Sequence, residues 1–159
     1  MSGIFATAGS RVFIGQTKDP QSNDFVAADF DGESWVEIAW LESIGQFGDE
    51  SAEITFDAIG EGRTQKLKGI RNAGNMELVA GVDHTDPGQQ ALLAAEALPN
   101  DFAFRVDFND AAVAGTPSQR FFIGKVMTAR EQLDTANNVV KRGGRIGINS
   151  NVVRVDAVP

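Results

Sequence analysis

Three segments of the chain decide the fold prediction: DPGQQALLAAEAL (86–98), FAFRVDF (102–108) and QRFFIGKVMT (119–128). In the first segment, Asp86 has the side chain of a helix N-cap, and Pro87 stands where its missing N–H costs nothing. Gln89 occupies the reciprocal capping position, and Pro99 ends the helical pattern. The apolar side of this helix would consist of Ala91, Leu92, Ala94, Ala95 and Leu98. The stretch therefore predicts one short capped α-helix followed by two strands.

Alternating apolar residues predict strands elsewhere in the chain. Val36, Ile38 and Trp40 would share one face of a strand. In the next strand, 51–57, one face would hold Ala52, Ile54 and Phe56, and the other Ser51, Glu53, Thr55 and Asp57. Further strands are predicted at 11–14, 76–82, 121–128, 139–148 and 152–155. The predicted fold class is mainly β: a β-sandwich or barrel-like subunit with one short flanking α-helix, in a single domain over 1–159.

Two segments have no sustained periodicity and are predicted to be irregular. Residues 1–34 are rich in Gly, Ser, Thr and Asp, so we expect an N-terminal arm and loop around the short strand at 11–14. Residues 58–75, AIGEGRTQKLKGIRNAGN, hold four glycines and the four bases Arg63, Lys66, Lys68 and Arg71. This segment is predicted to be a long loop, and loops of that length in compact domains usually contact a partner.

Composition excludes several classes of protein. The chain has no cysteine, which removes disulfides, thiolate catalysis and cysteine-based zinc sites. It has no apolar run of about 18 residues and no secretory signal pattern, so we expect folding in a cytoplasm, away from a membrane. The net charge of −8 argues against a protein that grips nucleic acid through phosphates. Such a surface suits either simple solubility or the passage of nucleic acid without adhesion.

No group of side chains predicts catalysis. His84 is the one histidine, and a loop position beside Asp83 and Asp86 makes it an ordinary hydrogen-bonded residue. The acidic segment 29–33, DFDGE, lacks the further ligands of a calcium loop. The glycine pairs lack the strand–turn–helix context of a phosphate-binding loop. We therefore predict a protein that is not an enzyme and that has no catalytic, cofactor or metal site.

An ordered set of motifs indicates a family. GQQALLA (88–94), FRVDF (104–108), FFIGKV (121–126), TAREQLDTANNVV (128–140) and a last strand at 145–149 follow one another in this order. In this respect the chain resembles the tail tube (major tail) proteins of lambda-like bacteriophages, which have long, non-contractile tails. The resemblance is clearest over 76–155.

The resemblance implies a structural virion protein. Six subunits would form a ring whose strands join into a continuous inner β-barrel, and stacked rings would form the hollow tube that conducts DNA. Residues 58–75 would contact the neighbouring ring, with Arg63, Lys66, Lys68 and Arg71 in that loop. Glu53 and Asp57 would face an acidic lumen that DNA passes without specific binding.

The family also implies partners and a location. Besides copies of itself, the chain would meet tape measure, tail terminator and tail tip proteins, in the tail of the virion after assembly in the host cytoplasm. Two alternatives remain open: a tube protein of a contractile injection or secretion system, and a small β-sandwich ligand-binding module. The absence of Tyr and the presence of only two Trp argue against the second alternative.

Overall fold

The computed structural model describes residues 3–111 and 114–158 of the chain. Eight of the strands form one antiparallel sheet in the order β2-β1-β7-β8-β9-β6-β3, with β10 also paired to β8. Their bounds are β1 Arg11–Thr17, β2 Val36–Ile38, β3 Leu41–Ser43, β6 Asn75–Gly81, β7 Phe102–Asp107, β8 Gln119–Gln132, β9 Lys141–Ile148 and β10 Val153–Val155. The prediction of a mainly β chain with one short α-helix is confirmed.

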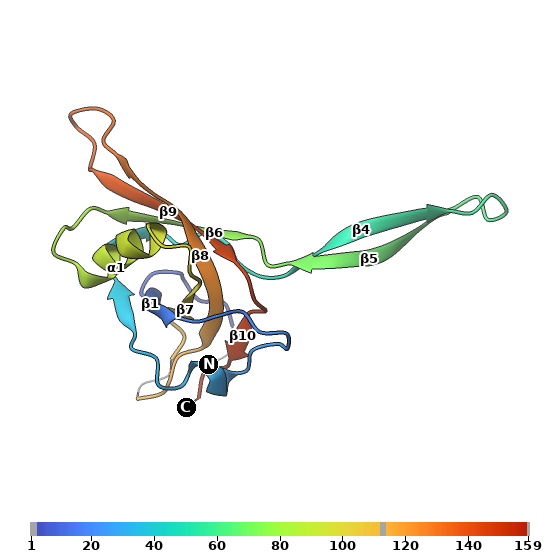
Figure 1. The fold of residues 1–159 in the computed structure, drawn as a ribbon, viewed down its shortest axis with the longest axis horizontal. Helices are drawn as coiled ribbons and strands as arrows, with labels where there is room; N and C mark the ends of the chain where they lie inside the picture. Colours follow the sequence, from blue (N-terminus) through green and yellow to red (C-terminus); the bar gives the residue numbers. More distant parts are fainter. Residues whose placement is uncertain (1–2, 112–113, 159) are drawn as a thin grey trace.

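The sheet curls strongly because its two edge strands are consecutive in the chain. β2 and β3 lie at opposite ends of the strand order, yet only Ala39 and Trp40 separate them. The helix α1, Pro87–Glu96, packs against β1, β2 and β8 (Figure 1). Gly88 permits this close approach, since a Cβ at that position would lie 2.0 Å from the backbone oxygen of Glu37. The result is a barrel-like body with the helix on one flank.

Two polar side chains, the partly buried N-cap Asp86 and the buried Gln89 of α1, hold this corner of the body together. Asp86 caps the helix as predicted, and its Oδ2 accepts from the backbone N–H groups of both Gln89 and Ala39, at 3.0 and 3.1 Å. The side chain of Gln89 does not form the predicted reciprocal cap. It is fully buried, and it donates to the carbonyls of Ala39 and Gly81 while accepting from the N–H of Asp83. Gln89 therefore joins α1 to the residue that follows β2 and to the last residue of β6, where buried backbone groups need partners.

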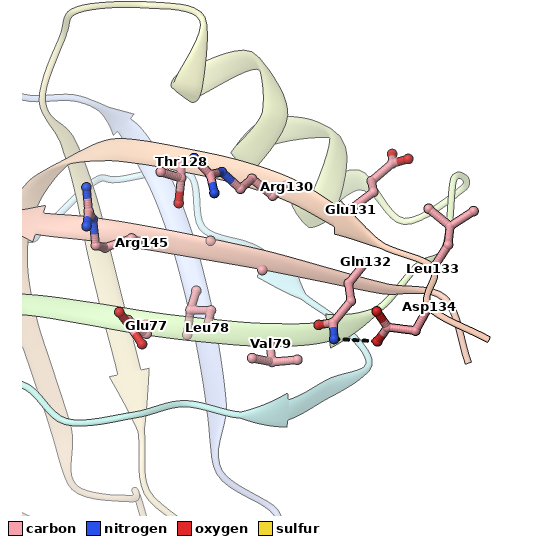
Figure 2. A pocket seen from close by; sticks show the side chains of 12 residues that line it. Glu77, Leu78, Val79, Thr128, Arg130, Glu131, Gln132, Leu133, Asp134 and Arg145 are labelled. Atoms are coloured by element: carbon pink, nitrogen blue, oxygen red, sulfur yellow. Dashed lines mark hydrogen bonds between the residues drawn. The ribbon is translucent and has the colours of Figure 1, made fainter. Parts of the chain in front are cut away.

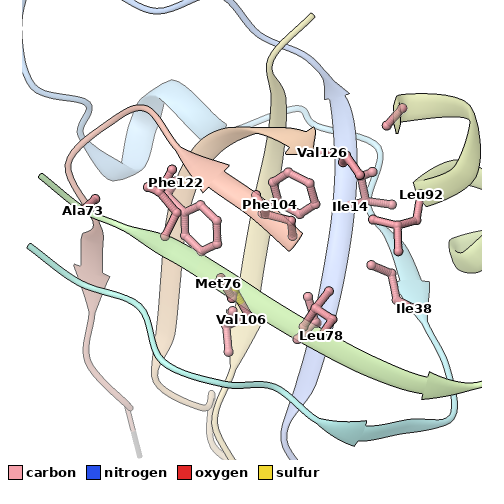
Figure 3. Close-up of a cluster of buried hydrophobic side chains, with 14 residues drawn as sticks. Ile14, Ile38, Ala73, Met76, Leu78, Leu92, Phe104, Val106, Phe122 and Val126 are labelled. Atoms are coloured by element: carbon pink, nitrogen blue, oxygen red, sulfur yellow. The ribbon is translucent and has the colours of Figure 1, made fainter. Parts of the chain in front are cut away.

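The main core fills the inside of the curled sheet. Its centre is the pair Phe104 and Phe122, which lie on adjacent strands and stack with their ring centroids 5.7 Å apart (Figure 3). Met76, Leu78 and Leu92 surround this pair, and α1 contributes Leu92 and Ala95 to the core. Leu98, which the helical pattern assigned to the apolar side of α1, lies beyond the helix end and is half exposed.

A second, smaller core covers the opposite face of β7 and β8. The short 3-10 helix η1, Ala27–Phe30, lays Phe30 on Phe121, with the ring centroids 5.2 Å apart. Phe25, Ala103, Ile123 and Val153 complete this cluster. The N-terminal segment is therefore more ordered than the predicted arm and loop: it contributes the seven-residue β1 and this covering layer.

Three structural predictions are wrong. Residues 58–75 are not a long loop, because 64–72 form the strand β5, Thr64–Asn72. The strand at 51–57 exists as β4, Glu50–Asp57, but it is not half-buried: Phe56 is 60% exposed. Trp40 does not share a buried face with Ile38, because the backbone turns between β2 and β3 and leaves Trp40 68% exposed.

Candidate assembly surfaces

The most unusual feature of the molecule is a hairpin that projects from the body. β4 and β5 pair only with each other, in a two-stranded antiparallel sheet separate from the main sheet. We call this hairpin, residues 50–72, the arm. Figure 1 shows it as a long blade that extends away from the strands of the body. A hairpin of this kind is marginally stable alone in water, so its apolar side chains and its strand edges are available for a partner.

One face of the arm is apolar and open to solvent. Ile54 lies directly opposite Leu67 in the register, and Phe56 follows on the same face of β4. These three side chains, the apolar face of the arm, are 49%, 59% and 60% exposed respectively. A contiguous exposed apolar surface on a soluble domain marks an interaction site.

The other face of the arm is charged and contains most of the predicted site residues. Glu53 lies opposite Lys68, and Asp57 lies opposite Thr64. The carboxylate of Glu53 also forms an ion pair with Lys66 across the strands, at 3.2 Å. The structure thus brings the two predicted acidic residues together with two of the predicted bases. This charged face, made of Glu53, Asp57, Lys66 and Lys68, has a formal net charge of zero.

The remaining two predicted residues lie at opposite ends of the arm. Arg63 is in the tip that joins β4 to β5, and its side chain is exposed. Arg71 is at the base, where its guanidinium pairs with Asp49. The strands also differ in charge: β4 carries the acids Glu50, Glu53 and Asp57, whereas β5 carries only bases.

An open hollow lies on the body, over β6, β8 and β9. Its volume is 590 Å³, and Gly143, which has no side chain, leaves space in its floor. Figure 2 shows Glu77 and Arg145 over neighbouring strands and a hydrogen bond of 2.6 Å from Gln132 Nε2 to Asp134 Oδ2. The lining contains charges of both signs and no histidine. The hollow is therefore a surface for polar contacts rather than an enclosed ligand pocket.

The polar residues that were weighed for catalysis or metal binding have structural contacts. His84 is exposed in the loop before α1, and its backbone carbonyl accepts from Gln90 Nε2 at 2.6 Å. In the 29–33 segment, Asp29 caps η1 by accepting from Val26 N–H, and Glu33 accepts from Gln16 N–H. Over residues 3–111 and 114–158 no three His, Cys, Asp or Glu side chains gather as a metal site would require. In the same ranges, neither helix is long and apolar enough to cross a membrane.

Two carboxylates of the body have pKa values below the ordinary range for aspartate. Two hydrogen bonds from Ser118 lower the pKa of Asp110. The hydroxyl Oγ donates to Asp110 Oδ2 at 2.6 Å, and the backbone N–H donates to Asp110 Oδ1, with an N–O distance of 2.8 Å. The equivalent bonds from Thr85 lower the pKa of Asp83. Both are loop carboxylates fixed by neighbouring donors, as hydrogen bonds favour the charged form.

Comparison with known proteins identifies the fold. No protein family model and no curated protein sequence matches the chain. Among solved structures, a chain of the anti-feeding prophage baseplate, 6-fold symmetrised, aligns with a TM-score of 0.73 at 13% identity, over 98% of each chain. The sheath/tube terminator structure of PVC, an extracellular contractile injection system, aligns at 0.65 and 12% identity, over 97% of this chain and 98% of that chain.

A phage tail structure has the same fold. The SPP1 tail tube aligns with a TM-score of 0.59 at 12% identity, over 94% of this chain and 78% of that chain. At such low identities these similarities establish the fold alone. The chain therefore has the fold found in tail-tube and terminator structures of phage tails and contractile injection systems. The general form of the predicted resemblance is confirmed, while its lambda-like detail stays a prediction.

The site missed by the sequence analysis is the apolar face of the arm. Its signal was present, because Ile54 and Phe56 alternate with polar residues in β4, and Leu67 stands between two lysines in β5. The alternation in 51–57 was interpreted as burial within the subunit. The strand at 64–72 gives no such signal, because its two apolar residues, Leu67 and Ile70, are not in alternation and the glycine and bases around them are typical of a loop.

Proposed function

We propose that this chain is a structural subunit that assembles with copies of itself into six-membered rings, stacked as a hollow tail tube. The observation that carries the proposal is the arm, whose apolar face stays exposed in the single subunit. Burying apolar side chains contributes about 25 cal/mol per Å² removed from water, so association is favourable for this surface. The shared fold with tube and terminator structures supports the same function.

The arm is suited to contact a neighbouring copy. Its eight-residue and nine-residue strands extend roughly 25–30 Å at about 3.3 Å per residue, which takes the tip beyond the body. Closed rings of identical subunits also leave no strand edge free to aggregate. We propose that the arm, including Arg63, Lys66, Lys68 and Arg71, contacts the adjacent ring. Tape measure, terminator and tail tip proteins would be further partners in the tail of the virion.

We propose that the charged face of the arm contributes to a lumen that does not hold DNA. The lumen wall formed by this face would be neutral rather than acidic, since Lys66 and Lys68 balance the charges of Glu53 and Asp57. Phosphate binding requires an excess of positive charge, and the balance removes that excess. Transported DNA would then pass without specific binding.

A tube of a contractile injection system is a second candidate. The anti-feeding prophage baseplate chain and the PVC sheath/tube terminator align at TM-scores of 0.73 and 0.65, against 0.59 for the SPP1 tail tube, whereas the PVC sheath-tube complex aligns at 0.54. A neighbouring gene for a sheath protein would favour this candidate, and its absence would favour a non-contractile tail.

Electron microscopy of the purified chain tests the proposal. We expect rings with six-fold end views, or tubes of constant bore, in negative stain. The matched control replaces residues 50–72 with a short Gly/Ser linker, which removes the arm and leaves the main sheet intact; this variant should remain monomeric. Monomers at every salt and protein concentration, also with other tail components present, would refute the proposed function.

A further inference from the structure

An apolar groove lies at the corner where β2 turns into β3. Trp40, Leu41, Val82 and Val139 form its apolar lining, and we call it the Trp40 groove; Glu42, Gly81, Asp83 and Lys141 complete it. Its volume is 680 Å³. Trp40 and Val139 are each 68% exposed, so the groove is an uncovered apolar surface on the body.

Trp40 is held in an exposed position by two constraints. Its backbone has φ 63°, a left-handed conformation that a bulky residue adopts only where the surrounding structure enforces it. Its indole Nε1 donates to Asp83 Oδ2 at 3.0 Å, and Asp83 is itself fixed by two bonds from Thr85. The indole ring is thus pre-positioned toward solvent. Rigid, exposed tryptophan side chains are typical anchors of protein interfaces.

We propose that the Trp40 groove receives the apolar face of the arm of a second copy of this chain. This inference rests on the proposed function and names the partner surface for the arm. The two surfaces lie at opposite ends of β6. The arm is connected to the first residue of β6, Asn75, through Ala73 and Gly74. At the last residue of β6, the N–H of Gly81 donates to the carbonyl of Trp40 at 2.9 Å. In Figure 1 the arm accordingly leaves the body on the side away from α1 and the C-terminal end of β6.

This placement is what head-to-tail assembly requires. A ring or stack of identical subunits needs two different, complementary surfaces on each subunit, facing in different directions. The arm supplies Ile54, Phe56 and Leu67 on one side, and the groove supplies an apolar recess on the other. Each copy can therefore insert its arm into one neighbour while its own groove receives the arm of another.

The charges around the two surfaces are complementary. In the groove, Glu42 is neutralised by Lys141 at 2.8 Å, whereas the hydrogen bonds of Asp83 come from the uncharged donors Trp40 and Thr85. The rim therefore has an excess negative charge. On the arm, β5 brings bases and no acid beside Leu67. Lys66 and Lys68 stay on the charged face when the apolar face enters the groove, and the positive charge along β5 favours the approach of this strand to the acidic rim.

Cysteine cross-linking tests the contact in a chain that has no native cysteine. Two single variants, Phe56→Cys and Val139→Cys, are mixed, assembled and oxidised. We expect a covalent dimer that requires both variants. In the control mixture, Ser22→Cys replaces Val139→Cys; Ser22 is exposed and lies outside the groove and the arm. Dimer yield should be at least about tenfold lower in this control.

A second variant separates docking from folding. Trp40→Gly removes the indole and places glycine at a position with positive φ, which glycine adopts without strain. We expect an unchanged or higher melting temperature and a loss of assembly. Val26→Ala, which truncates an exposed apolar residue elsewhere, should assemble like the wild type.

The outcomes distinguish this inference from the proposed function. If the Phe56→Cys and Val139→Cys variants assemble into tubes but give no cross-link on oxidation, the docking site is overturned and the tube function stands. Normal tubes from Trp40→Gly would have the same consequence. A specific cross-link without rings or tubes would support the docking site and refute the tube function. Equal cross-linking in the Ser22→Cys control would overturn the docking site.

Discussion

Ile54 and Leu67 lie directly opposite each other across the arm, and both side chains are about half exposed, at 49% and 59%. A cross-strand pair of this kind normally packs under a second layer, as Phe104 and Phe122 do in the body. In the arm the second layer is missing from the subunit. A covering molecule would complete the pair, and this is the geometric basis of the proposed self-assembly.

The apolar face of the arm should be needed for assembly and not for folding. We expect Ile54→Ser combined with Leu67→Ser to abolish rings and tubes, because the exposed pair contributes to the interface. The free energy of unfolding should change by less than about 1 kcal/mol, since the pair is not in the core. Urea denaturation and sedimentation velocity measure the two quantities.

The control for this variant lies on the other face of the same strand. Thr55→Ser changes a side chain opposite Lys66 and should leave both stability and assembly intact. If the Ile54 and Leu67 variant still assembles, the apolar face does not form the interface. A large loss of folding stability would instead mean that the arm belongs to the folding core.

Removing the acids of the charged face should make assembled tubes bind DNA. Glu53→Gln with Asp57→Asn leaves Lys66 and Lys68 unbalanced and changes the face from neutral to a charge of +2 per subunit. We expect DNA to co-sediment with these tubes at about 50 mM salt and to be released at about 200 mM, because phosphate contacts weaken steeply with salt. Wild-type tubes should retain little DNA under either condition. Equal retention by both proteins would show that this face does not meet DNA.

Gln89 should contribute more to stability than any other polar residue of α1. Gln89→Leu keeps the side-chain volume but leaves the carbonyls of Ala39 and Gly81 and the N–H of Asp83 without their partner. The expected loss is about 3 kcal/mol in the free energy of unfolding, from urea denaturation. The neighbouring Gln90→Leu is the control, since Gln90 is exposed and its change should cost less than about 1 kcal/mol. Similar losses for both variants would contradict the role of Gln89.

Asp110 should make folding stability depend on pH in the acid range. Its folded-state pKa is below the ordinary value of 3.8 because Ser118 donates to the carboxylate. Asp110 therefore stabilises the fold above that value, and its contribution disappears as the pH falls through the lower, folded-state pKa. We expect the stability difference between the wild type and Asp110→Asn to be greatest near neutral pH and to shrink on acidification. A difference that stays constant down to about pH 2 would contradict this account.

The sequence predicted the parts of the fold that bury their own side chains. The alternation in Phe102–Asp107 and the cap at Asp86 led to the correct strand and helix, because burial and capping occur within the subunit. Gln89 was assigned to the helix cap because local spacing indicates that function. Its actual partners, Ala39 and Gly81, come from distant parts of the chain, which spacing cannot reveal.

The exposure of the arm and of Trp40 could not be predicted for a related reason. The apolar residues of the arm have no cover within the subunit, and the alternation that places Ile54 and Phe56 on one face of a strand does not reveal that this face is exposed. Trp40 continues the alternation of Val36 and Ile38 in the sequence. Only its positive φ, which nothing local in the sequence requires, turns it out to solvent.

Amide hydrogen exchange, compared between dilute monomer and assembled protein, tests the central claim most directly. The claim is that the arm is ordered and covered by neighbouring copies. We predict that backbone amides of β4 and β5 exchange rapidly in the monomer and become protected on assembly, while those of β7 and β8 are protected in both states. Equal exchange of the arm in the two states, with new protection appearing only elsewhere, would contradict the account.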